Sequence, residues 1–234
     1  MNPVRNSGSK RLCSKISNGM KVISLWSGGK DCCLACYRAK TQGYDIVSLL
    51  NFTTPLEESS LSHGLSARVI DRQAKMTEIP SFQKAMPKEG YRDAFKSLIE
   101  EWKRTKGIAG IVFGDIYLEG HKEWIDSVCR ELQVTPVMPI WARDTTGLMN
   151  EFISLGFKSI IVATRVDKLG KEWLGREIDA NLMKEFEGMG NIDPCGENGE
   201  FHTFVYDGPL FKEKVKFSKG NKILRRGRWF LEVM

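Results

Sequence analysis

The sequence predicts an α/β protein with a parallel sheet, followed by a smaller and more irregular α/β part. Two observations support this fold class. Short apolar segments of strand length alternate with amphipathic segments of helix length through residues 20–136, an order typical of a parallel sheet with right-handed crossovers. Residues 108–113 are also continuously apolar or small, as expected for a strand that is buried on both faces.

In the first part, the expected strands and helices follow one another in turn. Strands are expected at residues 22–26, 46–52, 78–82 and 108–113, and helices at residues 31–42, 62–76, 91–106 and 119–132. Gly43 and Gly107 directly follow two of these helices, and glycine is common where helices end. A domain boundary is expected near residue 136.

The remaining chain predicts a second, smaller domain over residues 137–234. Strands are expected at residues 137–141, 159–164, 201–206, 214–217 and 229–233, and helices at residues 145–155 and 177–187. Residues 1–19 show no hydrophobic period, so we expect a disordered or non-native extension. The first ordered domain is then expected to occupy residues 20–136.

Composition and charge exclude several classes of protein. The chain is 41% hydrophobic and 27% charged, which is ordinary for a globular protein. Its apolar runs are far shorter than the roughly 18 residues of a membrane span. The formal net charge is +6, but residues 1–19 contribute +4 and residues 212–234 contribute +6. The chain between them is mildly acidic, which argues against a broad nucleic-acid-binding surface there. The basic C-terminal stretch is either a contact for nucleic acid or a solvated edge hairpin.

The cysteine pattern indicates a reducing compartment. Six cysteines in a chain of 234 residues are too few for a disulfide framework, and residues 1–19 lack the apolar core of a signal peptide. We therefore expect a cytoplasmic protein. Cys33 and Cys36 form a CxxC motif, but no second pair is nearby to complete a four-cysteine metal site. Burial as small apolar residues is the simpler explanation.

The most informative motif is Ser27-Gly28-Gly29-Lys30-Asp31, between the first expected strand and the first expected helix. The backbone N–H groups of such a loop lie at the positive end of a helix and bind phosphate. The two glycines allow close approach of the anion, and the Ser27 hydroxyl and the Lys30 ammonium add contacts. Asp31 is a candidate N-cap or Mg²⁺ ligand. The alternative is a turn that only caps the helix.

This motif resembles the PP-loop of N-type ATP pyrophosphatases, which have a Rossmann-like fold also described as adenine nucleotide alpha hydrolase-like. The family motif usually continues with Ser or Thr, whereas this chain has Cys32. The substitution removes one hydroxyl contact and leaves the backbone cradle in place.

Further motifs are similar, in the same order, to the diphthine–ammonia ligase family. They lie at residues 114–116, 139–141, 174–179, 195–204 and 207–211. The segments CGENGEFHTF and DGPLF are the most specific of them. The resemblance spans residues 20–217 and implies a PP-loop domain followed by a smaller domain that closes over the substrate.

The resemblance implies an ATP-dependent ligase. A substrate carboxylate, that of diphthine on elongation factor 2, would be adenylated, and ammonia from ammonium would then form an amide with release of AMP and pyrophosphate. ATP and Mg²⁺ are the implied cofactors, and no membrane or nucleic acid partner is expected. Lys30 and Asp31 are the candidate catalytic residues at the loop. The candidate ATP contacts are Trp26, Ser27, Gly28, Gly29, Lys30, Asp31, Asn51 and Asp115, with Asp31 also a candidate Mg²⁺ ligand.

The second half supplies the remaining site residues. Glu197 and Glu200 are candidate catalytic carboxylates for binding Mg²⁺, deprotonating ammonium or holding a cationic substrate; hydrogen bonding within their own loop is the alternative. Diphthine carries a quaternary ammonium group, which suits acidic and aromatic surroundings. The candidate substrate contacts are Trp141, Cys195, Gly196, Glu197, Glu200, His202 and Thr203.

Three other functions remain open at the level of sequence. A PP-loop enzyme of this kind would also suit a different carboxylate substrate. The CxxC motif would suit sulfur transfer to tRNA. A non-catalytic ATP-binding module would need only the first domain.

Overall fold

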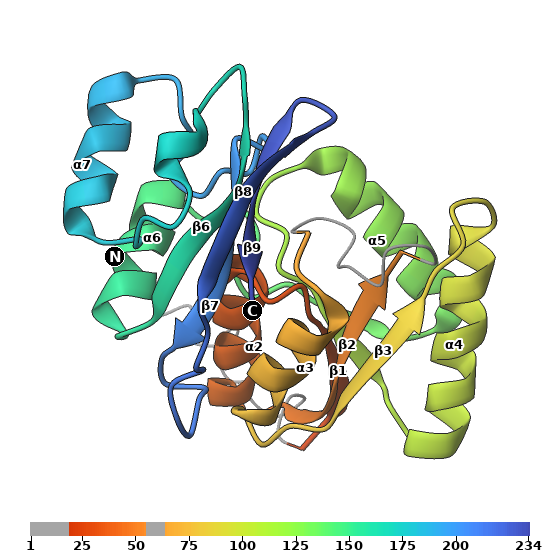
Figure 1. The fold of residues 1–234 in the computed structure, drawn as a ribbon. Helices are drawn as coiled ribbons and strands as arrows, with labels where there is room; N and C mark the ends of the chain where they lie inside the picture. Colours follow the sequence, from red (N-terminus) through yellow and green to blue (C-terminus); the bar gives the residue numbers. More distant parts are fainter. Residues whose placement is uncertain (1–18, 55–63) are drawn as a thin grey trace, which may run out of the picture.

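The computed structural model describes residues 19–54 and 64–234, which form two sheets with helices packed around them (Figure 1). Residues 1–18 of the expected extension lie outside the described residues. So do residues 62 and 63, at the start of the helix expected at 62–76.

The first sheet is parallel, with strands in the order β3-β2-β1-β4-β5. Its strands are β1 (Lys21–Leu25), β2 (Asp45–Thr53), β3 (Ser81–Ala85), β4 (Gly110–Val112) and β5 (Thr135–Val137). They alternate with helices α2 (Lys30–Thr41), α3 (Ala67–Lys75), α4 (Tyr91–Lys106) and α5 (Glu119–Leu132). The strand order reverses direction between β1 and β4, and ligands of such folds bind outside the carboxyl ends of the strands at this point.

Helices cover both faces of this sheet. Val22 packs into the apolar core that includes α2 and α3, whereas the adjacent Ile23 packs into the core formed with α4 and α5. Leu49 and Leu50 on β2 divide in the same way. Alternation of side chains between the two faces explains why these strands are apolar at consecutive positions.

The second sheet is antiparallel, with strands in the order β7-β6-β9-β8. Its strands are β6 (Lys158–Arg165), β7 (Phe201–Asp207), β8 (Lys219–Arg225) and β9 (Arg228–Val233). Two helices, α6 (Thr145–Ser154) and α7 (Ala180–Met189), and the 3₁₀ turn η1 (Lys171–Trp173) belong to this part. The side chains of Asp144 and Asp179 cap α6 and α7 by accepting hydrogen bonds from first-turn amides.

The two sheets share one apolar core. This core contains Cys33 and Leu34 of α2 together with Phe204 and Val205 of β7 and Phe186 of α7. Figure 1 shows the second sheet beside α2, with α6 and α7 on its far side. The second domain is therefore packed directly against the helix that begins at the Ser27–Asp31 motif.

Three expected strands differ from the structure. The strand expected at 137–141 is instead β5, Thr135–Val137, because Pro136 is tolerated in an edge strand and the chain turns where Trp141 N–H bonds to the Met138 carbonyl. The strand expected at 78–82 begins at Ser81, since Glu78 has a positive φ of 59°. The strand expected at 214–217 is irregular, and β8 follows it.

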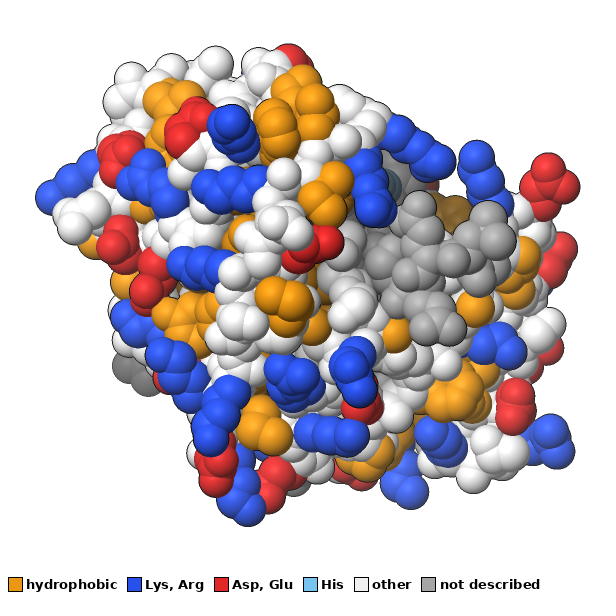
Figure 2. Space-filling model, viewed as in Figure 1, with side chains coloured by type: hydrophobic (Ala, Val, Ile, Leu, Met, Phe, Trp, Pro, Cys, Tyr) orange, Lys and Arg blue, Asp and Glu red, His pale blue; other side chains and the backbone are white. Residues whose placement is uncertain are grey.

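The basic C-terminal stretch forms the β8–β9 hairpin, whose lysines interact with the protein itself. Lys219 Nζ donates to the Gly175 carbonyl at 2.6 Å and Lys222 Nζ to the Lys171 carbonyl at 2.9 Å. Figure 2 shows Lys and Arg side chains spread over this face among acidic ones. This arrangement supports a solvated edge hairpin. Separately, none of the helices described here is both long and apolar enough to cross a membrane.

Because one core joins the two domains, we predict that they unfold together. Urea titrations followed by far-UV circular dichroism and by tryptophan fluorescence should give the same midpoint, as a single cooperative transition requires. Two separated midpoints would contradict a shared core.

Candidate functional site

A cavity of about 510 Å³ lies where β1, β2 and β4 end and the loop before β7 approaches them. Most of the predicted site residues line it, although they come from five separate parts of the chain. They are Trp26, Ser27, Lys30, Asp31, Asn51, Asp115, Cys195, Gly196, Glu197, His202 and Thr203. The sequence motifs therefore converge on one place, at the switch point of the parallel sheet.

The loop between β1 and α2 is built to leave backbone amides available to an anion. Gly29 is the N-cap of α2 and has no side chain to occupy the first-turn amides, of which the Lys30 amide donates to Thr203 Oγ1 at 3.0 Å. Gly28 has a φ of +83°, and a Cβ there would lie 2.5 Å from Ile70 Cδ1, so only glycine fits. The positive end of α2 thus faces the cavity, which is favourable for phosphate.

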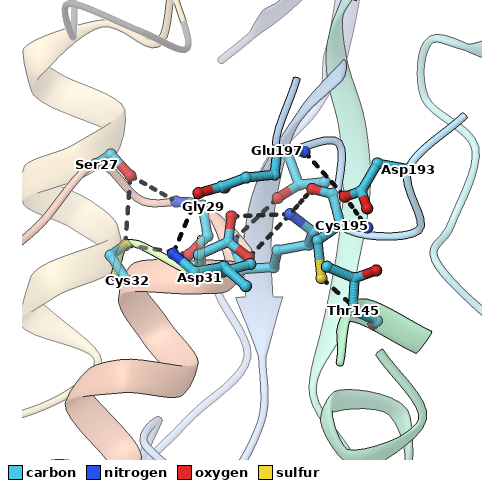
Figure 3. A network of polar contacts seen from close by, with 11 residues as sticks. Ser27, Gly29, Asp31, Cys32, Thr145, Asp193, Cys195 and Glu197 are labelled. Atoms are coloured by element: carbon cyan, nitrogen blue, oxygen red, sulfur yellow. Dashed lines mark hydrogen bonds and ion pairs between the residues drawn. The ribbon is translucent and has the colours of Figure 1, made fainter. Parts of the chain in front are cut away.

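Lys30 is buried within this loop and is held by acceptors from both domains. Its ammonium lies 2.8 and 3.0 Å from the two carboxylate oxygens of Asp31 and also donates to the Cys195 carbonyl (Figure 3). Burial disfavours the charge, but the attraction of Asp31 outweighs it and raises the pKa of Lys30. A permanent positive charge is therefore fixed beside the loop.

Cys32 occupies the position where the PP-loop motif usually has a hydroxyl residue. Its thiol donates to the Gly29 carbonyl at 3.1 Å and accepts from the Ser27 hydroxyl at 3.4 Å (Figure 3). Burial acts to raise its pKa, but hydrogen bonds from Cys33 and Ser27 outweigh burial and lower it. Cys33 and Cys36 are enclosed in the apolar core, with exposed fractions of 0%, and burial raises the pKa of Cys36 to about 12. The CxxC pair thus packs as small apolar side chains.

The loop from Asp193 to Glu200 is folded by its own acidic side chains. Asp193 Oδ1 accepts from the amides of Cys195 and Glu197 at 3.0 and 3.1 Å. Glu200 Oε1 accepts from the Asp193 amide at 3.2 Å, and its side chain is almost fully buried. Glu200 therefore lies behind the loop and outside the cavity lining, which differs from its expected place as a substrate contact.

Glu197 projects from this loop into the cavity (Figure 3). Its Oε1 accepts from the Ile116 amide at 3.1 Å, which ties the loop to the segment after β4. Burial, with the nearby Asp31 charge as a smaller cause, raises the pKa of Glu197 to about 7. A carboxyl group with this pKa can exchange a proton near neutral pH.

Asp115 follows β4 at the same edge of the sheet. Its carboxylate lies 2.8 Å from His121 Nδ1, and the N-cap of α5 is Leu118, so Asp115 does not cap that helix. The neighbouring Gly114 allows close approach, because a Cβ there would lie 2.9 Å from the Cys32 amide nitrogen. His121, which the sequence did not single out, also lines the cavity.

Of two further expected contacts, Trp141 lies outside the cavity lining and His202 lies within it. Trp141 lies in the turn after β5, outside the cavity lining, with Lys122 Nζ 6.0 Å from its ring centroid. Since the strand expected at 137–141 ends at Val137, Trp141 does not extend to the sheet edge. His202 does line the cavity, but burial lowers its pKa to about 3. It is therefore neutral at physiological pH and cannot act as an acid there.

Gln73 on α3 is a central residue that sequence reasoning missed. Its side chain is fully buried and joins three groups. Gln73 Nε2 donates to the carbonyls of Gly28 (2.9 Å) and Val205 (2.6 Å), and Oε1 accepts from Trp26 Nε1 (2.9 Å). A glutamine in the middle of an amphipathic helix carries no motif signal, so only the tertiary structure identifies it.

Comparisons with known proteins agree with these motifs. A family model described as the diphthamide synthase N-terminal domain matches residues 20–136, and one described as the diphthamide synthase C-terminal domain matches residues 144–233. The diphthine–ammonia ligase of Danio rerio is 28% identical over 223 residues, covering 84% of this chain and 86% of the relative. That of Mus musculus is 28% identical over 240 residues, covering 92% and 89%. That of Schizosaccharomyces pombe is 24% identical and matches 84% of this chain but 36% of its own length.

The buried hydrogen bonds of Gln73 predict a large effect of its removal. Gln73→Leu should lower the free energy of unfolding by about 2–4 kcal/mol, because buried polar groups lose their partners. Gln83→Leu is the matched control. It removes one bond, from Gln83 Nε2 to the Ala67 carbonyl, and should cost less than about 1 kcal/mol. Urea unfolding measures both, and equal losses would contradict a special role for Gln73.

Proposed function

The chain belongs to the diphthamide synthase family, and from this premise we propose that it is an ATP-dependent carbon–nitrogen ligase that converts diphthine on elongation factor 2 to its amide. The observation that carries the proposal is the single cavity that joins the Ser27–Asp31 loop to the Glu197 loop. One half suits the phosphates of ATP, and the other offers a group that can handle the proton of ammonium.

The cavity suits ATP at both ends of the nucleotide. The first-turn amides of α2 and the Lys30 charge suit the phosphates. At the end of β2, Asn51 Nδ2 donates to the Trp26 carbonyl at 2.6 Å. Its Oδ1 is buried and has no hydrogen-bond donor among the described residues. Such an acceptor, which lines the cavity, suits the amino group of adenine.

Asp31 is the proposed protein ligand of Mg²⁺. Groups of three or more potential metal ligands are absent from the part of the chain that the structure describes. Mg²⁺ is commonly bound by one or two carboxylates together with substrate phosphates and water, so one carboxylate beside the phosphate loop is sufficient. When bound, the ion would neutralise charge on the pyrophosphate leaving group.

The proposed reaction has two steps. A carboxylate oxygen of the substrate attacks the α-phosphorus of ATP, and the bond from that phosphorus to the bridging oxygen of pyrophosphate breaks. The loop amides and Lys30 stabilise the charge that develops on pyrophosphate. Ammonia then attacks the acyl carbon, and AMP leaves with the bonding electrons. Glu197 accepts the proton that ammonium must lose to become a nucleophile.

The proposal also includes a protein substrate and a cellular compartment. The substrate is a protein side chain, which requires that elongation factor 2 reach the open side of the cavity. The described cysteines are all free thiols, in keeping with a cytoplasmic reaction. Sulfur transfer finds no support from Cys33 and Cys36, which are enclosed in the core.

Product analysis tests the proposal. The protein is incubated with ATP, Mg²⁺ and ammonium, with and without elongation factor 2 that carries diphthine, and the nucleotides are resolved. We expect AMP and pyrophosphate in amounts that depend on the modified factor, and no AMP from Lys30→Ala, which lacks the loop charge. Lys30→Gln is the second variant, to be used if Lys30→Ala does not fold.

The other outcomes separate the alternatives. AMP formed without dependence on the factor would keep the adenylation but reject diphthine as the acceptor. ADP, or tight ATP binding without turnover, would reject the ligase. Full activity of Lys30→Ala would reject the phosphate-loop assignment.

The raised pKa of Glu197 predicts a specific pH dependence. Because the carboxylate is the active form, kcat/KM for ammonium should decline about tenfold per pH unit below about 7 and level off above it. Rates are expressed against the concentration of ammonium at each pH, and Glu197→Gln is measured in parallel. The variant lacks the base and depends on free ammonia alone, so its profile should show no break near pH 7. A wild-type profile without that break would show that Glu197 is not the base.

A further inference from the structure

One wall of the cavity is aromatic and has no part in the chemistry described above. Phe52 at the end of β2, Tyr91 at the start of α4 and Trp124 on α5 all line it. Each ring is partly exposed, whereas Phe95 packs behind them with an exposed fraction of 0%. The ring centroids of Phe95 and Trp124 are 5.4 Å apart. The core is therefore complete without burying the cavity sides of these three rings.

The three rings form a corner and not a slot. The Phe52 and Tyr91 centroids are 5.9 Å apart with an interplanar angle of 78°. The Tyr91 and Trp124 centroids are 6.1 Å apart at 46°. Two parallel rings would suit a flat purine. Rings inclined steeply to one another suit a rounded group, and π faces attract one that is positively charged.

The charges around this corner also favour a cation. Asp115 and Glu197 line the same cavity. The Lys30 ammonium is already held by Asp31 and the Cys195 carbonyl, and His121 Nδ1 lies 2.8 Å from Asp115.

Arg92 is a further cation near the corner. It lies 5.9 Å from the Trp124 ring centroid and pairs with Glu131 at 2.6 Å, a carboxylate that it shares with Lys96 at 2.8 Å. Among the described residues, Glu197 forms no ion pair with a cationic side chain, so its carboxylate is the charge in the cavity that favours a cation.

We propose that Phe52, Tyr91 and Trp124 form the subsite for the quaternary ammonium group of the protein substrate. This inference rests on the proposed function, in which the substrate is diphthine. A trimethylated nitrogen has no N–H to donate, so carboxylates cannot bind it through hydrogen bonds. Aromatic faces with negative charge nearby are the chemistry that recognises it. These three rings would thus bind the quaternary ammonium group in place of Trp141, which lies outside the cavity lining.

Kinetics of ring-removing variants test the subsite. Tyr91→Leu keeps an apolar side chain and removes the π face. We expect its KM for elongation factor 2 carrying diphthine to rise about tenfold, while KM for ATP changes less than about twofold. The loss of affinity for the factor should depend on the aromatic ring and not on the hydroxyl. Tyr91→Phe should therefore bind the factor at least about five times more tightly than Tyr91→Leu. Phe82→Leu, at an exposed aromatic residue outside the cavity lining, is the matched control and should match the wild type.

A rise in KM for ATP alone would overturn the proposal and assign the corner to adenine. An unchanged KM for the factor in both Tyr91→Leu and Phe52→Leu would overturn it as well. The second variant removes a different ring, so one misfolded variant does not leave the question open.

Direct measurement of cation binding tests this subsite independently of the proposed function. Tetramethylammonium and 3,3-dimethylbutan-1-ol, which carries an uncharged tert-butyl group of similar shape, are titrated into the whole protein by calorimetry, with NaCl at matched ionic strength as control. We expect tetramethylammonium to bind and Tyr91→Leu to weaken it about tenfold, with no comparable binding of the alcohol. Equal binding of both probes, or none by the cation, would overturn the subsite. If the wild type makes no amide from the modified factor but still binds tetramethylammonium through Tyr91, the proposed substrate fails and the cation subsite stands.

Discussion

The structure depends on the hydrogen bond from the Val205 amide to the Gly28 carbonyl, which joins β7 to the phosphate loop at 3.0 Å. Three neighbouring hydrogen bonds reinforce it. Lys30 N–H donates to Thr203 Oγ1 at 3.0 Å, and Gln73 Nε2 donates to the carbonyls of Gly28 and Val205. A loop rich in glycine has many accessible conformations, and these contacts select one of them. The second domain is therefore a structural part of the anion site.

This junction changes the expected role of the second domain. A domain that closes as a separate lid would share few contacts with the first, but β7 shares an apolar core with α2. Cys195 also supplies a carbonyl to Lys30, so the charge beside the loop is fixed by both domains. The acyl-adenylate of the proposed reaction would need protection from water. Residues of both domains line the cavity, so its walls would supply that protection without the closure of a separate lid.

The sequence predicted the fold well, for physical reasons. Helices α4 and α5 begin and end where their apolar period and the glycine at 107 indicate. The glycines also indicated the conformation of the Ser27–Asp31 loop, because Gly28 has a positive φ that other residues avoid. Edge strands were harder to predict. Each residue of β8 is at least partly exposed, so no apolar alternation marks it. Gln73, Glu200 and Trp141 were missed or misplaced because their roles depend on contacts between distant segments.

The cavity separates charge along its length, and this separation follows from the two domains. The α2 end offers backbone amides and Lys30, which suit an anion, and β4 and the 193–200 loop bring Asp115 and Glu197 to the remaining wall. Burial is the main reason that Glu197 has a pKa of about 7, and the nearby charges of Asp31 and Asp115 raise it by less. The same carboxylates would attract a cation to the cavity. The proposed ligase would bring a nucleotide anion, ammonium and a quaternary ammonium side chain together, and the loop anchored on Ile116 N–H places the Glu197 carboxylate in the cavity where it would act.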